Sequence, residues 1–408
     1  MAVGPDSRPE IAPVAGIRLG VTAAGVRGAD RNDLAVFELA AGSRTAAVFT
    51  RNRLRAAPVL VAEEHLAAAA PRLLVINTGS ANAATGSQGL TTARAVCAAA
   101  GELFGVAPEA VLPFSTGVIG EPLRLAPFEA GLPACRESLQ ADAEAWWQAA
   151  DAIRTTDTRA KAASRTLELD GTTVTVTGIA KGSGMIHPNM ATMLAFVATD
   201  AAVADEPLAA LLRAAADGSF NRISVDGDTS TNDALTLTAT GAAGNSPIES
   251  ASDPRLPALQ EAVAGVCRDL ALAIVRDGEG ATRLLTIRIE GAADEAEAGA
   301  VAEAIACSPL VKTAAYAGDP NWGRILAAAG AALAGAVDWD RVDLHIGGTR
   351  IVRGGVVDPD YTEAAGEAAM APEEVTITLT LGRGEAADWM WTCDLSHEYV
   401  TINAEYRS

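Results

Sequence analysis

The chain has 408 residues, 49% of them hydrophobic, and a formal net charge of −20 from 31 basic and 51 acidic residues. This length is enough for two or three domains, or for one large layered domain with an appendage. No basic run stands out and the acidic balance repels polyanions, so nucleic acid and anionic membrane surfaces are excluded as expected partners.

The cysteines and histidines do not form a metal site in the sequence. The five cysteines are odd in number and contain no CxxC pair, which predicts reduced, mostly buried thiols in a cytosolic compartment. The four histidines have no ligand spacing, so no metal is expected. The N-terminus lacks a basic patch followed by an apolar core, and no long uncharged apolar segment appears elsewhere. We therefore expect a cytoplasmic protein without a membrane anchor.

The first part of the chain contains two predicted strands that each end in a polar, glycine-containing loop. Short strands are expected at residues 17–24, 34–39, 46–49, 58–62, 72–76 and 111–114, and a long helix at 90–104. Asn77 begins a run of small and amide residues, which either holds an anion closely or forms a plain turn. Ser115, Thr116 and Gly117 either present backbone N–H groups to an oxyanion or form a turn with glycine at positive φ.

The middle of the chain predicts a helix, a polar cluster and a hairpin. An amphipathic helix is expected at residues 137–152, with its two tryptophans in the core. The polar run at residues 155–158 fits a helix cap or a ligand contact. Asp170-Gly171 indicates a two-residue hairpin turn between strands at 165–169 and 172–177, and this hairpin leads to Lys181.

Residues 181–198 combine a glycine-rich approach with an apolar run, and the junction between them is Ala191-Thr192. If the chain is cut there, Thr192 gains a free α-amine beside its hydroxyl, a pair that acts as base and nucleophile without histidine or aspartate. An unperturbed α-amine has a pKa of about 7.7 to 8.0, so modest desolvation or a nearby cation suits it to a general base. Lys181 is either that cation and an anchor for a carboxylate, or a solvated surface lysine. The dipeptide alone is more typical of an ordinary strand.

The second half of the chain alternates helices and strands. Helices are expected at residues 207–216, 254–275, 295–307 and from 319 onward, and strands at 193–198, 235–240, 283–289, 342–346, 349–352, 375–381 and 399–403. Asp205 is expected to cap the first of these helices. The polar run at 219–233 fits turns held by Asx hydrogen bonds better than a cation loop, because the EF-hand positions are missing. Glu279, between glycines, is either a solvated turn residue or an exposed ligand group.

The order of these elements favours one fold class. Because helices and strands intermix throughout with several hairpins, a mixed α/β (α+β) layered fold is favoured over a doubly wound parallel one. Neither GxGxxG after a strand nor GxxxxGK[ST] is present, so nucleotide-phosphate binding is not expected.

Several of these segments together resemble the ornithine acetyltransferase family, also called glutamate N-acetyltransferase or ArgJ. The matching segments follow one another along nearly the full chain, at residues 77–83, 115–120, 181–194, 219–233, 277–282, 308–313, 319–324 and 403–408. The segment KGSGMIHPNMATML at 181–194 is highly specific, and a chance match to all of them is implausible. The chain departs from the family pattern at Thr78, Ser80, Ala84 and Ser408, which affects substrate detail rather than the nucleophile.

The resemblance implies a self-cleaving enzyme with a layered αββα sandwich, mixed sheets and a smaller α/β part. Cleavage between Ala191 and Thr192 gives an α chain, residues 1–191, and a β chain, residues 192–408, which form one intertwined catalytic unit and assemble as a heterotetramer of two α and two β chains. Thr192 is the implied nucleophile that accepts acetyl from N-acetylornithine and passes it to glutamate. The implied oxyanion hole is Thr116 and Gly117, and the implied substrate contacts are Thr155, Lys181, Thr192, Glu279, Asn403 and Ser408. No cofactor is expected, with acetyl-CoA as a possible co-substrate.

Two other functions stay open. An N-terminal-nucleophile amidase or aminopeptidase would use the same Thr192 but transfer the acyl group to water. An uncleaved amino-acid-binding protein would need no nucleophile. Self-cleavage separates the binding protein from both enzymes, and dependence on glutamate separates the transferase from the hydrolase.

Overall fold

The structure, a computed structural model, describes residues 2–5, 8–28, 31–187 and 193–405. The chain divides into two compact units. The larger unit consists of Ser7–Asn221 and Thr229–Ile274, and the smaller unit of Met1–Asp6, Arg222–Asp228 and Val275–Ser408. Each unit contains helices and mixed β-sheet, which confirms the predicted α/β class.

Two mixed sheets form the centre of the larger unit. The first has the order β1 (Ile17–Thr22), β2 (Leu34–Leu39), β4 (Leu73–Asn77), β5 (Val111–Ser115). The second has the order β3 (Arg44–Phe49), β10 (Ala234–Ala239), β8 (Leu194–Thr199), β7 (Thr172–Lys181), β6 (Lys161–Leu169). The pairs β4–β5 and β8–β10 are parallel, and the other pairs are antiparallel.

Alternation along the strands places apolar side chains on both faces of the first sheet. In β2, Leu34 and Val36 join the apolar cluster on the outer face, whereas Ala35 and Phe37 join the cluster between the sheets. The short helix α4 (Ala143–Ala152) fills part of that inner space, where the buried Trp146 packs edge-on against Phe37 with ring centroids 5.8 Å apart. The predicted core position of this tryptophan is therefore confirmed.

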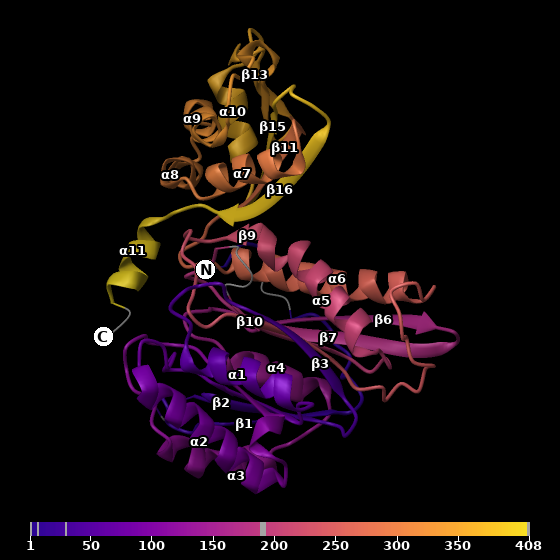
Figure 1. Ribbon diagram of the computed structural model, residues 1–408. Helices are drawn as coiled ribbons and strands as arrows, with labels where there is room; N and C mark the ends of the chain where they lie inside the picture. The colour runs from indigo at the N-terminus through magenta and orange to yellow at the C-terminus, as the bar shows by residue number, and fades with distance from the viewer. Residues whose placement is uncertain (1, 6–7, 29–30, 188–192, 406–408) are drawn as a thin grey trace. The chain divides into compact units, whose positions relative to one another are not determined.

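Helices cover the outer faces of both sheets, which completes the αββα arrangement. On the first sheet, α2 (Gly86–Phe104) and α3 (Ala126–Glu137) cover the outer face, and α1 (Ala57–Ala68) packs beside β5 and α2. On the second sheet lie α5 (Asp205–Asp217) and α6 (Leu256–Arg276), as Figure 1 shows. The absence of a side chain at Gly178 lets α6 approach β7 closely, because a Cβ there would lie 3.1 Å from Leu270.

The smaller unit is built on one sheet of seven strands. Its order is β14 (Val356–Val357), β13 (Thr349–Arg353), β12 (Asp343–Ile346), β15 (Glu374–Thr380), β11 (Leu284–Ala292), β16 (Ala386–Cys393), β9 (Ile223–Ser224). The helices of this unit are α7 (Glu295–Ala306), α8 (Pro309–Ala317), α9 (Trp322–Ala332), α10 (Glu363–Met370) and α11 (His397–Ala404). The core forms where α7, α9 and α10 pack on the sheet.

Four local predictions are wrong. The helix expected at residues 137–152 begins only at Ala143, because residues 138–142 connect α3 to α4. Residues 58–62 lie in α1 rather than in a strand, since Pro58 occupies the first turn of the helix, where its missing N–H costs nothing. Residues 399–403 lie in α11, because a short alternating run does not separate strand from helix without its packing partner. Asp205 is the first residue of α5 rather than its cap, which is Ala204. The predicted hairpin is confirmed, with Asp170 and Gly171 both at positive φ between β6 and β7.

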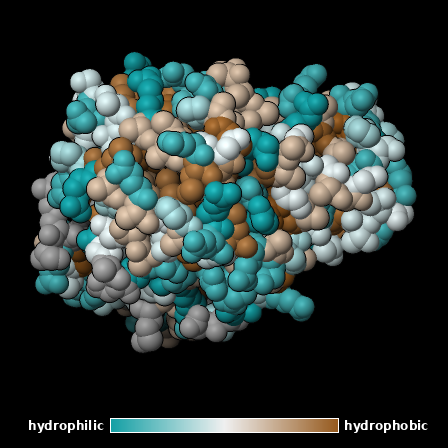
Figure 2. Space-filling model, turned by 90° about the horizontal axis from the view of Figure 1, so that it is seen from below, coloured by the Kyte–Doolittle hydropathy of each residue, from teal (hydrophilic) through white to brown (hydrophobic). Residues whose placement is uncertain are grey.

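Surface and thiol properties agree with the composition. Figure 2 shows a face on which hydrophobic patches alternate with hydrophilic side chains. Among the described residues, no helix is both long and apolar enough to span a bilayer. All five cysteines are free thiols, of which four are buried, and this confirms the expected burial of most of them.

Candidate functional site

The candidate site begins at the carboxyl ends of β4 and β5, which are parallel neighbours. Thr116 follows β5 directly and is buried. Gly117 has φ of 133° and packs against the Gly79 peptide, and a Cβ at Gly117 would lie 2.6 Å from the Gly79 carbonyl oxygen. Within the part of the chain that the structure describes, no acceptor takes the Gly117 N–H, so this group is available to an oxyanion.

Buried amide side chains hold in place the two loops that follow β4 and β5. The Asn77 side chain donates to the Ser80 carbonyl at 3.0 Å and accepts from the Ser115 hydroxyl at 2.6 Å. The Asn232 side chain donates to the carbonyls of Ala81 and Ser115 at 2.6 and 2.9 Å. Since residue 232 precedes β10, this amide connects the ends of the two sheets and holds the Gly117 loop in place.

Lys181 lies at the end of β7 and is 8% exposed, so the prediction of a solvated surface lysine is wrong. Its Nζ atom donates to the Thr116 hydroxyl at 3.4 Å. An ammonium group buried next to the Gly117 amide gives this end of the sandwich a positive potential. The arrangement suits an anionic ligand or a developing oxyanion.

A second buried lysine lies in the same region and is paired. Lys161 Nζ donates to Asp157 Oδ1 at 2.7 Å, and both side chains are almost completely inaccessible. Asp157 also accepts from the Gly182 N–H at 2.6 Å and from the Thr155 N–H at 3.0 Å. Burial alone would raise the pKa of Asp157, but Lys161, Lys181 and the hydrogen-bond donors together lower it well below its usual value. Asp157 is therefore a carboxylate.

A buried carboxyl with the opposite pKa shift also faces Lys181. Asp233 is 2% exposed, and its Oδ2 atom has no hydrogen-bond donor in the described part of the chain. Burial raises the pKa of Asp233 well above its usual value, against the opposing effects of Ser230, Lys181 and the Met193 N–H. Burial thus opposes ionisation of this carboxyl.

Backbone strain concentrates in the site loops. Among the described residues, four other than glycine have positive φ, and three of them are Asn82, Ala84 and Met185. Such conformations cost of order 1–3 kcal/mol each and persist where the surrounding structure enforces them. Met185 belongs to the glycine-rich segment that leads toward the predicted cleavage bond.

In the smaller unit, Glu279 is buried and its Oε2 atom accepts from Asn403 Nδ2 at 2.7 Å, so it is neither the solvated turn residue nor the exposed group that the sequence left as alternatives. Tyr399 donates to Asp226 Oδ2 at 3.2 Å, and burial, Asp226 and Glu279 together raise the pKa of the tyrosine. A Cβ at Gly280 would lie 2.7 Å from the Tyr399 nitrogen, so the Glu279 loop packs directly against the start of α11. This unit thus presents carboxyl groups that suit an ammonium ligand.

The structure places the predicted residues in two sets. Thr116, Gly117, Thr155 and Lys181 lie close together in the larger unit, whereas Glu279 and Asn403 are in contact in the smaller unit. Ala191, Thr192 and Ser408 are outside the described residues. No group of three potential metal ligands occurs among the residues whose placement is described. Sequence reasoning missed Lys161 and Asp233 altogether. A signal existed for Lys161, because Asp157 lies four residues earlier.

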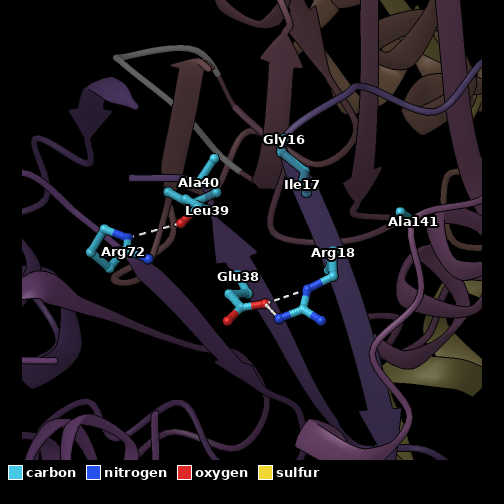
Figure 3. Close-up of a pocket in the computed structure, with 8 residues that line it drawn as sticks. All are labelled: Gly16, Ile17, Arg18, Glu38, Leu39, Ala40, Arg72 and Ala141. Atoms are coloured by element: carbon cyan, nitrogen blue, oxygen red, sulfur yellow. Dashed lines mark hydrogen bonds and ion pairs between the residues drawn. The ribbon is translucent and has the colours of Figure 1, made fainter. Parts of the chain in front are cut away.

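A pocket lies at the opposite end of the first sheet. Figure 3 shows its lining residues around the start of β1 and the end of β2, among them Arg18, Glu38 and Arg72. Arg18 is paired with Glu38 at 2.6 Å, and Arg72 Nε donates to the Leu39 carbonyl at 2.9 Å. Because Arg72 precedes β4 whereas the Asn77 loop follows it, this pocket is separate from the candidate site.

The layered α/β fold, the closely packed Gly117 peptide and the buried Lys181 together suit an enzyme that stabilises an oxyanion beside an anionic ligand. The family model for the ArgJ family matches residues 18–408. The arginine biosynthesis bifunctional protein ArgJ of Pseudomonas syringae pv. tomato is 50% identical over 408 residues, which cover 100% of each chain. This chain belongs to the ArgJ family, and the resemblance read from its sequence is confirmed.

Two solved structures are also similar. The arginine biosynthesis bifunctional protein ArgJ of Bacillus halodurans has 40% sequence identity and a TM-score of 0.50, covering 53% of this chain and 100% of its own. The ornithine acetyltransferase of Mycobacterium tuberculosis, solved with ornithine, has 31% identity and a TM-score of 0.39, covering 44% of this chain and 94% of its own.

Proposed function

We propose that this enzyme transfers acetyl from N-acetylornithine to glutamate in arginine biosynthesis, through an acetyl ester on Thr192. The observation that carries the proposal is the buried ammonium of Lys181 beside Thr116 and the Gly117 N–H, which no described residue accepts, in a chain 50% identical to an arginine biosynthesis protein. These groups match a reaction that binds amino-acid carboxylates and passes through an oxyanion.

The nucleophile arises by self-cleavage between Ala191 and Thr192. The Thr192 hydroxyl attacks the Ala191 carbonyl, the peptide C–N bond breaks as the ester forms, and water then hydrolyses the ester to free an α chain and a β chain. The strained backbone at Met185 supports this proposal. The match to the Bacillus halodurans structure also supports it. That whole chain covers slightly more than half of this chain, and residues 192–408, the proposed β chain, make up the same share.

Acetyl transfer then proceeds in two half-reactions. The α-amine of Thr192 takes the hydroxyl proton as the oxygen attacks the acetyl carbonyl, and ornithine leaves with its amine protonated. The amine of glutamate attacks the acetyl ester next and regenerates the hydroxyl. Gly117 N–H and Thr116 stabilise the oxyanion in both steps, Lys181 and Thr155 bind the substrate carboxylate side, and Glu279, Asn403 and Ser408 bind the ammonium side.

The same proposal includes the assembly, the compartment and the co-substrates of the enzyme. The cleaved chains assemble as a heterotetramer of two α and two β chains in the cytoplasm. The reaction needs no cofactor, because every group it uses is a protein side chain, backbone amide or α-amine. Acetyl-CoA is included as a second acetyl donor for glutamate.

Denaturing electrophoresis with N-terminal sequencing tests the nucleophile. Wild-type protein should give two bands, one of which begins at Thr192. Thr192→Ala should remain a single band and lose acetyl transfer entirely, while Thr192→Ser should retain part of both activities because it keeps a hydroxyl. A single intact band from active wild-type protein would contradict the mechanism.

Incubation with N-acetylornithine, with and without glutamate, tests the acceptor. The transferase should release ornithine in proportion to N-acetylglutamate formed. Release of ornithine at the same rate without glutamate would favour the amidase. Replacing N-acetylornithine by acetyl-CoA shows whether the site also accepts a thioester.

A further inference from the structure

Asp157 connects two segments that the proposed function assigns to substrate binding. Its carboxylate oxygens accept hydrogen bonds from the backbone of Thr155 and of Gly182, which follows Lys181 directly. A second bond joins the same two segments, because the hydroxyls of Thr156 and Ser183 lie 2.6 Å apart. The relative position of Thr155 and Lys181 therefore depends on this junction.

The junction requires a carboxylate rather than an amide. Asp157 Oδ1 accepts from Lys161 Nζ and from Gly182 N, and Oδ2 accepts from Thr155 N. An asparagine would direct its NH₂ group at one of these donors, so at least one bond would be lost. At 5% exposure Asp157 has little access to solvent, and its action on a ligand must pass through its neighbours.

We propose that Asp157 is a positioning residue that holds the Thr155 segment against the end of β7, so that Thr155 and Lys181 contact the substrate together. The proposal rests on the proposed function, which assigns both contacts. The segment beyond Gly182 leads to the Ala191-Thr192 bond, so the same junction also positions the chain for self-cleavage. Lys161 neutralises Asp157, which leaves the charge of Lys181 for the substrate.

Three variants separate positioning from charge balance: Asp157→Asn, Lys161→Met, and the two combined. The combined variant removes both charges, so it should unfold at nearly the wild-type urea concentration. We expect a fall of about 100-fold in one of two quantities, either kcat/KM for N-acetylornithine per cleaved chain or the rate of self-cleavage. Misplacing binding groups by about 1 Å lowers a rate by about this factor. Lys161→Met keeps both backbone hydrogen bonds of Asp157 and should lose less than about 10-fold.

Charge balance alone predicts a different pattern. In that case the two single variants would be equally impaired and the combined variant would regain wild-type cleavage and turnover, which would overturn the proposal. Should the combined variant not fold, the single variants decide: a larger loss in Asp157→Asn supports positioning, and equal losses overturn it.

Two controls complete the experiment. Glu144→Gln removes an exposed ion pair with Arg8 and should leave cleavage and turnover unchanged. Wild-type protein that cleaves but transfers no acetyl would contradict the proposed function. In that case the cleavage rates of the variants would still test the positioning role of Asp157.

Discussion

Asp157 and Asp233 are both buried aspartates under the influence of Lys181, and their pKa values are shifted in opposite directions. Burial raises the pKa of each carboxyl. At Asp157 the ion pair with Lys161 and two backbone donors outweigh burial, whereas Asp233 has one oxygen without a donor among the described residues. The comparison shows that the charges and donors around a buried carboxyl, and not its depth alone, set the direction of its pKa shift.

This difference has a consequence for Lys181. Asp157 forms its ion pair with Lys161, and the raised pKa of Asp233 opposes ionisation there, so among the described residues Lys181 is not the direct ion-pair partner of either carboxyl. The ammonium thus stays available to an incoming carboxylate. A site with two ionised aspartates would instead hold Lys181 in an internal ion pair.

The largest effect is expected from Asp157→Asn. This change leaves Lys161 as a buried cation without its partner, which costs about 3–5 kcal/mol. Urea unfolding at neutral pH should show a loss of that size. A loss below about 1 kcal/mol would mean that Asp157 carries no charge in the folded protein.

Lys181→Met should have the next largest effect, mainly on activity. Loss of a buried charged partner costs about 2–5 kcal/mol, which corresponds to a fall in kcat/KM of roughly 30-fold or more. The fall should appear with substrates that carry a free carboxylate and should be smaller for an N-acetyl amine without one. Equal losses on both substrates would show that Lys181 does not bind the carboxylate.

The smallest effect is the pH dependence of Asp233→Asn. A carboxyl with a raised pKa stabilises the fold below its unfolded pKa of about 3.9, and this contribution is lost as the pH rises through the folded pKa. The free energy of unfolding of the wild type, relative to the variant, should therefore fall as the pH rises above about 4. Lys181, Ser230 and the Met193 N–H are the groups that oppose this trend.

Asp157 should behave in the opposite way. A carboxyl with a lowered pKa stabilises the fold above about pH 4, and the contribution is lost as the pH falls below that value. Wild-type protein should therefore gain stability relative to Asp157→Asn as the pH rises from 3 to 5. Parallel pH profiles for the two variants would contradict the comparison.

Much of the fold could be predicted from the sequence, because most elements have a clear period or a distinct turn. The Asp170-Gly171 hairpin and the core position of Trp146 are examples. Residues 58–62 and 399–403 could not be assigned correctly, since runs this short fit both a helix and a strand until packing decides.

The site could be predicted only where a residue stands out from its neighbours. Thr116 and Lys181 follow strands and adjoin glycines, so they were recognisable. Asp233 is one of many polar residues between 219 and 233, and its burial results from its place directly before β10, which has a strand on either side in the second sheet. Lys161 lies four residues after Asp157, so their pairing could be suspected from the spacing, but the burial of both side chains becomes evident only in the folded chain.

The strands β7 and β8 lie side by side, with antiparallel register from Val176↔Thr199 to Lys181↔Leu194. The proposed cut falls in the connection between them. The two strands therefore pair while they belong to one polypeptide, and after the cut they stay paired as parts of two chains. Refolding of the processed enzyme would be an encounter between separate chains, whereas the uncut Thr192→Ala protein would refold alone. Under the proposed cleavage, the enzyme would be assembled once, and its lifetime would depend on how slowly it unfolds rather than on an equilibrium.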